Sequence, residues 1–264
     1  KVKSKKFLLK YINNNSVDIF LIDGPGKGCS RNFLYLACNK SIKADFYAFS
    51  DQDDIWETNK LSEGLNELLK FDSNVPSLFG SRTIIIDKHN DQKGFSPLVK
   101  RKLAFVNAAV QSFAGGNTMM FNQSARKLLM IHGSDIDIKM HDWWLYLLVS
   151  GAEGKVIYSK IPLVRYRQHP SNIIGENNSF NAKFNRIRQI FDGSFKSWMK
   201  RNNKQLLSHP SLLAMENYNT LKEYSEISKK SSFERFKIQR RVGLYRQNLI
   251  QNIFLNVAII FGLL

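Results

Sequence analysis

Three carboxylates occur within four residues in the segment Asp51–Asp54, directly after the apolar run Phe46–Phe49. The run is typical of a buried strand, and because aspartate is a poor strand former, the strand must end at the acids. In an open α/β sheet this edge is where ligands bind, and clustered carboxylates there suit Mg²⁺ or Mn²⁺ holding a diphosphate. The alternative is an acidic turn in which Asp54 caps a helix expected over Thr58–Leu69, although a cap needs only one acid.

A second candidate group opens a helix that is expected to run to about Val149. Asp142 lies in its first turn, where the helix dipole favours a carboxylate, so a plain helix-start acid is one interpretation. Trp143 and Trp144 follow and point in different directions on a helix, which allows one to pack in the core and the other to wall a cleft. The two tryptophans therefore favour a site.

Two glycines and a histidine give weaker signals. Gly115 and Gly116 precede a strand-like run that starts near Asn117, and glycines there let a backbone approach a ligand closely, as they also would in an ordinary turn. His169 follows the end of a strand-like run, where a histidine can bind a ligand or transfer a proton.

Arg31 is a further candidate because of its place at a helix start. Ser30 can cap a helix over Arg31–Asn39, whose first turn would carry Arg31 towards the same sheet edge as Asp51. A solvated surface charge is the alternative for this arginine.

The elements that would position these residues alternate between strand and helix patterns. Strands are expected over Asp18–Ile22, Phe46–Phe49, Leu78–Ile86, Asn117–Phe121, Lys155–Ser159 and Leu163–Arg167, and helices over Lys5–Asn13, Arg31–Asn39, Thr58–Leu69, Leu103–Val110 and 141–149.

From Asn181 onward the pattern changes to helices with basic faces, expected over Ala182–Phe191, Phe195–Leu207, Leu212–Ser228 and Phe233–Arg241. This region contributes 15 Lys/Arg against 5 Asp/Glu between residues 183 and 246. The apolar end, Asn248–Leu264, is too short and interrupted to predict a transmembrane span but long enough to lie in a membrane interface. A helix packed on the protein's own core is the alternative.

Composition limits the classes of function. With 264 residues, 43% of them hydrophobic, the chain can bury one sizeable core. The net charge of +17 implies an anionic partner, which could be nucleic acid, a nucleotide-linked substrate or an acidic membrane surface. Cys29 and Cys38 form neither a disulfide framework nor a metal-binding spacing, which fits a reducing cytoplasm.

Five segments, in this order, carry a resemblance to a known family: Gly28–Phe33, Phe49–Trp56, Gly116–Met119, His141–Trp144, and Tyr166–His169 with Asn172 and Gly175. The chain resembles the bacterial family 2 glycosyltransferases of the rhamnosyltransferase-like group. The resemblance implies the GT-A fold, a Rossmann-like α/β domain with a mixed sheet flanked by helices, over residues 1–178. Residues 179–264 would form a basic helical extension, with a possible association with a membrane surface.

The resemblance also implies roles for individual residues. Asp51 and Asp53 would meet a divalent cation, Mg²⁺ or Mn²⁺, and the donor diphosphate, and Asp142 would be the catalytic base. Arg31 and Gly116 would lie near the donor. The acceptor side or cleft would include Asn117, Trp143 and Trp144, and a further metal or diphosphate contact would come from His169.

Members of this family normally begin with a central strand followed by Thr-Tyr-Asn, then a helix and a second strand. None of this precedes Lys1. A missing central strand would leave unpaired sheet edges, so we expect the chain to be an N-terminally incomplete form.

The resemblance therefore implies an inverting glycosyltransferase that moves rhamnose or another hexose from a dTDP- or UDP-sugar to a cell-surface polysaccharide or lipid-linked glycan. We expect it in the cytoplasm, peripheral at the inner face of the cell membrane and bound to its anionic surface. One alternative is an inactive remnant that binds a membrane or partner enzymes. A basic nucleic-acid-binding protein would explain the charge but not the acids, so no nucleic acid partner is expected.

Overall fold

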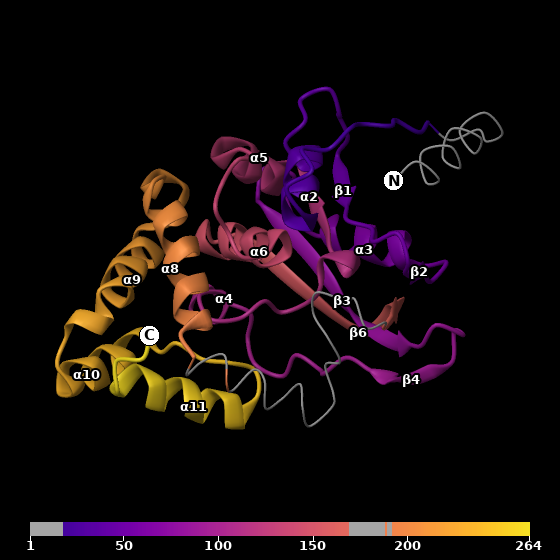
Figure 1. Cartoon of the computed structure of the whole chain (residues 1–264). Helices are drawn as coiled ribbons and strands as arrows, with labels where there is room; N and C mark the ends of the chain where they lie inside the picture. Colours follow the sequence, from indigo (N-terminus) through magenta and orange to yellow (C-terminus); the bar gives the residue numbers. More distant parts are fainter. Residues whose placement is uncertain (1–17, 169–187, 189–191) are drawn as a thin grey trace.

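The computed structural model describes residues 18–168, 188 and 192–264 (Figure 1). Its strands form one sheet in the order β1-β5-β3-β6-β2, with β4 paired to β3. Among these pairs β3 and β6 run parallel and the others antiparallel, so the sheet is mixed. The strands are β1 (Phe46–Ala48), β2 (Ile55–Trp56), β3 (Ser77–Ile86), β4 (Gln92–Phe95), β5 (Met120–Asn122) and β6 (Lys155–Arg167).

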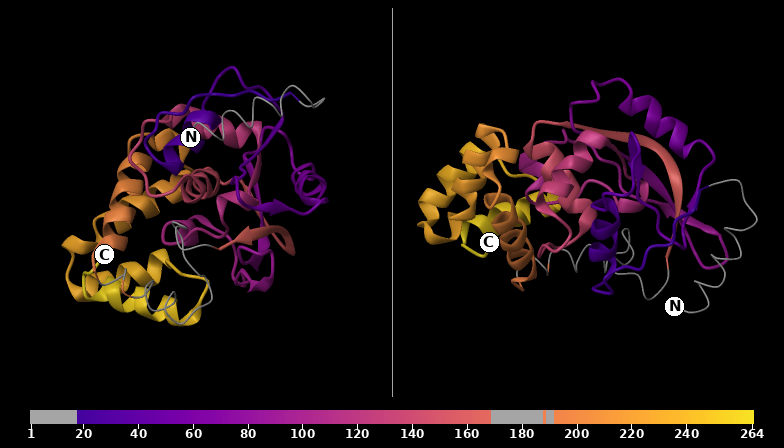
Figure 2. Two further views of the ribbon diagram at one scale, coloured as in Figure 1. Left: turned by 45° about the vertical axis from the view of Figure 1, so that its right-hand side comes forward. Right: turned by 90° about the horizontal axis from the view of Figure 1, so that it is seen from above.

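Helices cover both faces of the sheet because side chains alternate along its strands. Leu78 and Phe121 belong to the larger core, beneath α5 (Gln123–His132) and α6 (His141–Gly151). Phe79 and Met120 point the other way, against α3 (Lys60–Leu68). Every residue of α6 is buried, as expected of a helix enclosed on all sides (Figure 2). This curled mixed sheet flanked by helices confirms the predicted α/β class and is consistent with the Rossmann-like GT-A fold.

Several predicted boundaries are wrong for local reasons. Asp18–Ile22 is not a strand, because none of the described strands pairs with it, and Phe20 is 79% exposed. Helix α2 (Cys29–Ala37) follows Gly28, and the hydroxyl of Ser30 donates to Met140 Sδ (3.5 Å) instead of capping the helix.

Other differences lie within elements that were expected. The two strands predicted over residues 155–167 form the single strand β6, with register shifts where β3 faces Pro162, a residue that has no N–H to donate. Helix α4 (Phe105–Ala108) is shorter than expected. Helix α5 was not predicted, although Asn122 caps it by accepting from the N–H of Ala125 (2.9 Å).

The C-terminal helices gather at one end of the molecule, with α6 between them and the sheet (Figures 1 and 2). Their buried side chains belong to the same core cluster as α6, and Phe195 stacks on Trp143 at 6.3 Å. The predicted domain boundary at residue 178, and nearly all of the helix expected over Ala182–Phe191, lie outside the described residues. The helices are α8 (Ser194–Leu207), α9 (Met215–Ser225), α10 (Ser232–Val242) and α11 (Leu249–Ile260), with short 3₁₀ turns at Pro210–Leu212 and Ile227–Lys229. None of the described helices is both long and apolar enough to cross a membrane.

Candidate active site

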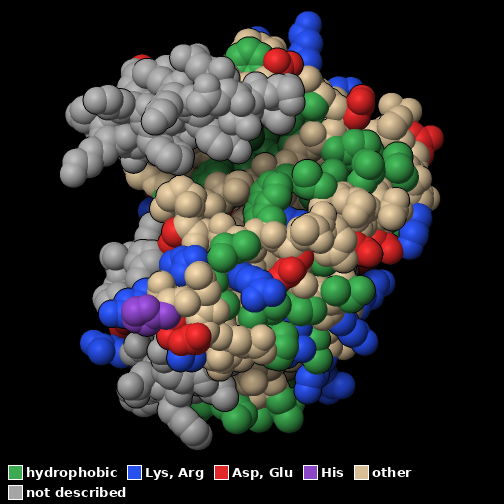
Figure 3. All heavy atoms as spheres, turned by 90° about the vertical axis from the view of Figure 1, so that its right-hand side faces the viewer, with side chains coloured by type: hydrophobic (Ala, Val, Ile, Leu, Met, Phe, Trp, Pro, Cys, Tyr) green, Lys and Arg blue, Asp and Glu red, His purple; other side chains and the backbone are tan. Residues whose placement is uncertain are grey.

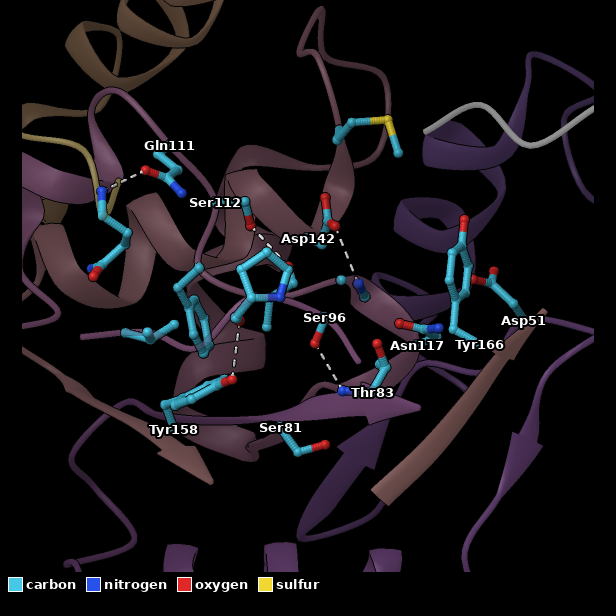
Figure 4. Close-up of a pocket in the computed structure, with 18 of the residues that line it drawn as sticks. Asp51, Ser81, Thr83, Ser96, Gln111, Ser112, Asn117, Asp142, Tyr158 and Tyr166 are labelled. Atoms are coloured by element: carbon cyan, nitrogen blue, oxygen red, sulfur yellow. Dashed lines mark hydrogen bonds between the residues drawn. The ribbon is translucent and has the colours of Figure 1, made fainter. Parts of the chain in front are cut away.

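One cavity of about 490 Å³ brings together five of the residues predicted from the sequence (Figure 4). Asp51 and Asp53 enter it from the loop after β1, and Asp142 enters it from the start of α6. Gly116 and Asn117 belong to the 3₁₀ turn Gly116–Thr118, which leads into β5. A second hollow adjoins Asp51 on the side of α2, where Asn32, Phe33 and Leu36 help to line it.

The loop of Asp51–Asp54 is crowded with negative charge. Burial, and then the nearby carboxylates of Asp54, Asp53 and Asp142, raise the pKa of Asp51 to about 6. In the close-up, Asp51 lies beside the ring of Tyr166 at the edge of the cavity (Figure 4). A cation bound here would relieve this repulsion.

Asp54 holds this loop in place. It accepts hydrogen bonds from the side-chain amide of Asn117 and from the backbone N–H of Arg167 (3.0 Å). The Arg167 guanidinium in turn donates to the carbonyls of Asp53 (2.9 Å) and Asp87 (3.0 Å). Burial raises the pKa of Asp54, while the bonds from Asn117 and Arg167 oppose that rise. Helix α3 begins after Asn59, so Asp54 does not cap it. Its role is to fix the positions of the other two acids.

A buried lysine that sequence reasoning missed lies near these acids. Lys60 is 2% exposed, and its Nζ lies 3.2 Å from the centre of the Trp56 ring without a hydrogen-bond partner among the described residues. Burial lowers the pKa of Lys60 to about 7, and the charges of Asp54 and Asp51 oppose that shift. Lys60 shares the buried face of α3 with Gly64 and Leu68, and this spacing of four residues was a signal available in the sequence.

Asp142 is 4% exposed and held by two backbone donors. Its Oδ2 accepts from the N–H of Gly116 (3.1 Å), and its Oδ1 accepts from the N–H of Trp143 (2.7 Å). A Cβ at Gly116 would lie 2.6 Å from Nε2 of His141, so glycine is required for this close approach. These contacts fix the carboxylate at the cavity wall.

His141 lines the same wall. Its ring stacks on Phe33 at 4.3 Å and meets the ring of Phe49 edge-on at 4.8 Å. Neither ring nitrogen has a hydrogen-bond partner within the described ranges, and burial lowers the pKa of His141. The imidazole is therefore neutral at physiological pH and adds no positive charge beside Asp142.

Asp51 and Asp53 fit a metal site in which the substrate supplies some of the remaining ligands. In the described part of the chain, no group of three or more His, Cys, Asp or Glu side chains is arranged to hold a metal ion. Mg²⁺ in nucleotide sites is commonly bound by one or two carboxylates, with substrate phosphates and water supplying the other ligands. Asp51 and Asp53, with the raised pKa of Asp51, suit such a site.

Other predicted site residues lie elsewhere. Arg31 does not line either cavity: its guanidinium pairs with Asp135 and donates to the carbonyl of Ser134 (3.1 Å). Trp143 and Trp144 are 6% and 0% exposed and neither lines the cavity, so the expectation that one walls a cleft is wrong. Helix α6 is enclosed on all sides, and both rings therefore pack in the core. His169 lies outside the described residues.

The C-terminal region forms part of the cavity wall, which the sequence did not indicate. The residues that contribute are Arg246 and Gln247, which precede α11, and Gln251 within it. Gln247 donates its backbone N–H to the side chain of Gln111 (2.9 Å), another residue of the wall (Figure 4). The basic helices are thus joined to the candidate site.

No protein-family model matches the chain. It is 30% identical over 172 residues to the dTDP-rhamnosyl transferase RfbG of Shigella flexneri, a stretch that covers 61% of this chain and 56% of that protein. This similarity supports a relationship to the glycosyltransferases. The chain thus spans little more than half the length of this curated relative.

Proposed function

We propose that this protein is an inverting glycosyltransferase that moves a sugar, rhamnose or another hexose, from a nucleoside diphosphate donor to a glycan acceptor. The observation that carries the proposal is the convergence of Asp51, Asp53 and Asp142 on one cavity. The similarity to a dTDP-rhamnosyl transferase supports the same reaction class and makes dTDP-rhamnose the first donor to test, followed by UDP-sugars.

The acids after β1 would hold the donor diphosphate. Asp51 and Asp53 would bind a divalent cation, Mg²⁺ or Mn²⁺, which when bound stabilises the charge that develops on the departing diphosphate. Asp54, fixed by Asn117 and Arg167, keeps the two acids in place. The hollow between Asp51 and α2 suits the nucleoside, because Phe33 and Leu36 offer apolar contacts there and Asn32 offers polar ones.

Asp142 would act as the general base. The acceptor hydroxyl attacks the anomeric carbon from the face opposite the diphosphate; the new C–O bond forms as the old one breaks, and the bonding electrons leave with the diphosphate. The hydroxyl proton passes to the carboxylate of Asp142. The N–H groups of Gly116 and Trp143 orient this carboxylate. Asp135 and Asp137 are poorer candidates, because they are mostly exposed and paired with Arg31 and Arg201.

The test is Asp142→Asn in the full-length protein. It retains the shape of the side chain but removes its basicity, so we expect turnover to fall about 10²–10⁴-fold while donor affinity stays close to the parent. Asparagine offers one acceptor oxygen in place of the two that accept from Gly116 and Trp143, so the melting temperature should fall modestly. Asp137→Asn, at an exposed carboxylate, is the control and should retain turnover. Near-parental turnover in Asp142→Asn would exclude the base role.

A further inference from the structure

Helix α11 has a buried face that reaches the cavity. Gln251, Leu255, Ala258 and Ile259 are between 0% and 6% exposed, and Gln251 lines the cavity. This packing shows that α11 belongs to the folded core and is a fixed part of the site wall.

The opposite face of α11 is apolar and exposed. Leu249, Ile253, Val257 and Phe261 recur every fourth residue, with exposed fractions of 73%, 53%, 36% and 71%, and Ile250 beside them is 59% exposed. Residues spaced by four lie on one side of a helix, so these five side chains form a continuous strip, here called the α11 stripe. No acidic or basic residue occurs between Gln247 and Leu264, although the whole chain has a net charge of +17.

Positive charge gathers on the neighbouring helix. Helix α10 packs beside α11, where the Gln239 amide donates to Asn256 Oδ1 (2.8 Å). Helix α10 carries one acid, Glu234, and four bases, Arg235, Lys237, Arg240 and Arg241, and Lys229 and Lys230 precede it. On the face drawn in Figure 3, hydrophobic side chains lie at the lower edge of the molecule, with Lys and Arg side chains on the surface above them.

Two aromatic side chains of α10 are also exposed. Phe233 and Phe236 are 67% and 43% exposed, and the charged groups of Lys237 and Arg240 lie over their rings at 4.4 and 5.9 Å. A ring that enters the boundary of a bilayer thus has a cation next to it at the level of the headgroups.

We propose that the α11 stripe docks on the surface of an anionic phospholipid bilayer, with the α10 cations on the lipid headgroups. The combination of an apolar helix face and adjacent cations is the one that binds peripheral proteins to anionic membranes. The helix has 12 residues and is therefore about 18 Å long, too short to span a bilayer core of roughly 30 Å. It lies along the surface.

A second copy of the chain is a poorer occupant of this face. Stable protein interfaces bury about 800 Å² on each partner, and one helix face about 18 Å long and 10 Å wide offers much less. The adjacent cations would also repel the same cations of a second copy.

Docking in this orientation also has a consequence for the acceptor of the transfer reaction. This step of the inference rests on the function proposed above. Gln251 lines the cavity from the face of α11 opposite the stripe, so the cavity wall lies about one helix diameter, roughly 10 Å, from the lipid. A glycan whose lipid anchor remains in that bilayer would be presented to this wall. The acceptor class that fits is therefore a lipid-linked glycan.

Vesicle co-sedimentation of the full-length protein tests the docking. The parent should bind vesicles of phosphatidylcholine with phosphatidylglycerol, bind phosphatidylcholine alone weakly, and lose binding as salt rises. Ile253→Asp should lower the partition coefficient at least about tenfold, because it removes an apolar contact and adds a charge that anionic lipid repels. The matched control is Ile131→Asp on α5, where the isoleucine is 52% exposed against 53% for Ile253. It should bind like the parent.

Three outcomes would overturn the proposal. Ile253→Asp could bind vesicles as well as the parent does, or Ile131→Asp could lose as much binding as Ile253→Asp. The third outcome is a parent protein that binds no vesicles but forms a dimer in light scattering, which Ile253→Asp dissociates. Asp142→Asn should bind vesicles like the parent whatever its turnover, which separates failure of docking from failure of the proposed function. Once a donor and an acceptor are identified, Ile253→Asp should lower transferase activity on an acceptor embedded in vesicles. It should leave activity on a water-soluble acceptor unchanged. Equal loss on both acceptors would overturn the inference about the acceptor.

Discussion

Gly116 donates its backbone N–H to Oδ2 of Asp142 across 3.1 Å, and this bond joins the turn before β5 to the start of α6. The two residues are 26 positions apart, yet they form one wall of the cavity. A backbone donor cannot rotate away as a side chain can, so the carboxylate is held in one orientation before any substrate binds.

Gly116→Ala adds only one methyl group, but it should therefore disturb the site strongly. The added Cβ would lie 2.6 Å from His141 Nε2 and 3.3 Å from Asp142 Cβ, so the turn and α6 must separate and the bond to Oδ2 lengthens. We expect turnover to fall about tenfold to a hundredfold, since small misplacements of catalytic groups cost that much. Enzyme kinetics on the purified variant measure it. Adding His141→Ala makes room for the Cβ and should restore part of the loss. If Gly116→Ala retained parental turnover, the close approach would have no catalytic role.

The crowded carboxylates predict a stability change that depends on pH. The pKa of Asp51 is raised from 3.8 to about 6, so in the folded state this group releases its proton at a higher pH than in the unfolded chain. Its contribution to stability is complete below about pH 4 and is lost as pH rises through 6. Asp51→Asn should therefore stabilise the protein at pH 7, by about 1–2 kcal/mol after allowance for solvent screening, and the gain should vanish near pH 4.

Melting temperatures of Asp51→Asn and its parent across this range provide the measurement. The same variant should lose metal-dependent donor binding, which calorimetry with Mg²⁺ and a nucleoside diphosphate would detect. A stability difference that stays constant from pH 4 to pH 8 would show that Asp51 does not titrate in this window.

The sequence predicted the parts of the site that depend on local chemistry. An apolar run followed at once by acids placed Asp51 and Asp53 at the end of β1, and both line the cavity. Asp142 was predicted at the start of a helix, and Gly116 in the turn before a strand, and both lie where they were expected. In each case the residue types themselves determine where an element begins or ends.

Contacts between distant segments could not be predicted in this way. Arg31 was expected to face Asp51 on the basis of its helix start, but its partner Asp135 lies 104 positions along the chain. The two tryptophans were assigned to different environments because helix periodicity places neighbouring residues on different faces, and periodicity carries no information when every face of α6 is buried. The tail residues of the cavity wall have no local signal of any kind.

Gln247 offers a test of whether the C-terminal helices and the sheet form one cooperative unit. Its Oε1 accepts from the backbone N–H groups of Lys100 (3.1 Å) and Arg101 (2.8 Å), and its Nε2 donates to Arg101 O and Asn107 Oδ1 (both 3.2 Å). One side chain thus ties the segment before α11 to the segment around α4. Gln247→Ala should cost about 0.5–1.5 kcal/mol, because three of the four hydrogen bonds are exposed and water can take the place of the lost side chain. For a chain of this size that lowers the melting temperature by roughly 1–6 °C.

Because the buried side chains of α8 to α11 share the core of α6, calorimetry should show a single unfolding transition, shifted as a whole in Gln247→Ala. Gln205→Ala on α8 is the control, since its side chain makes no hydrogen bond among the described residues, and it should melt like the parent. Two transitions, with only one of them shifted, would instead mean that the C-terminal helices unfold independently, as a boundary near residue 178 implies. The tail would then be an appended module, and its contribution to the cavity wall would be separable from the stability of the sheet.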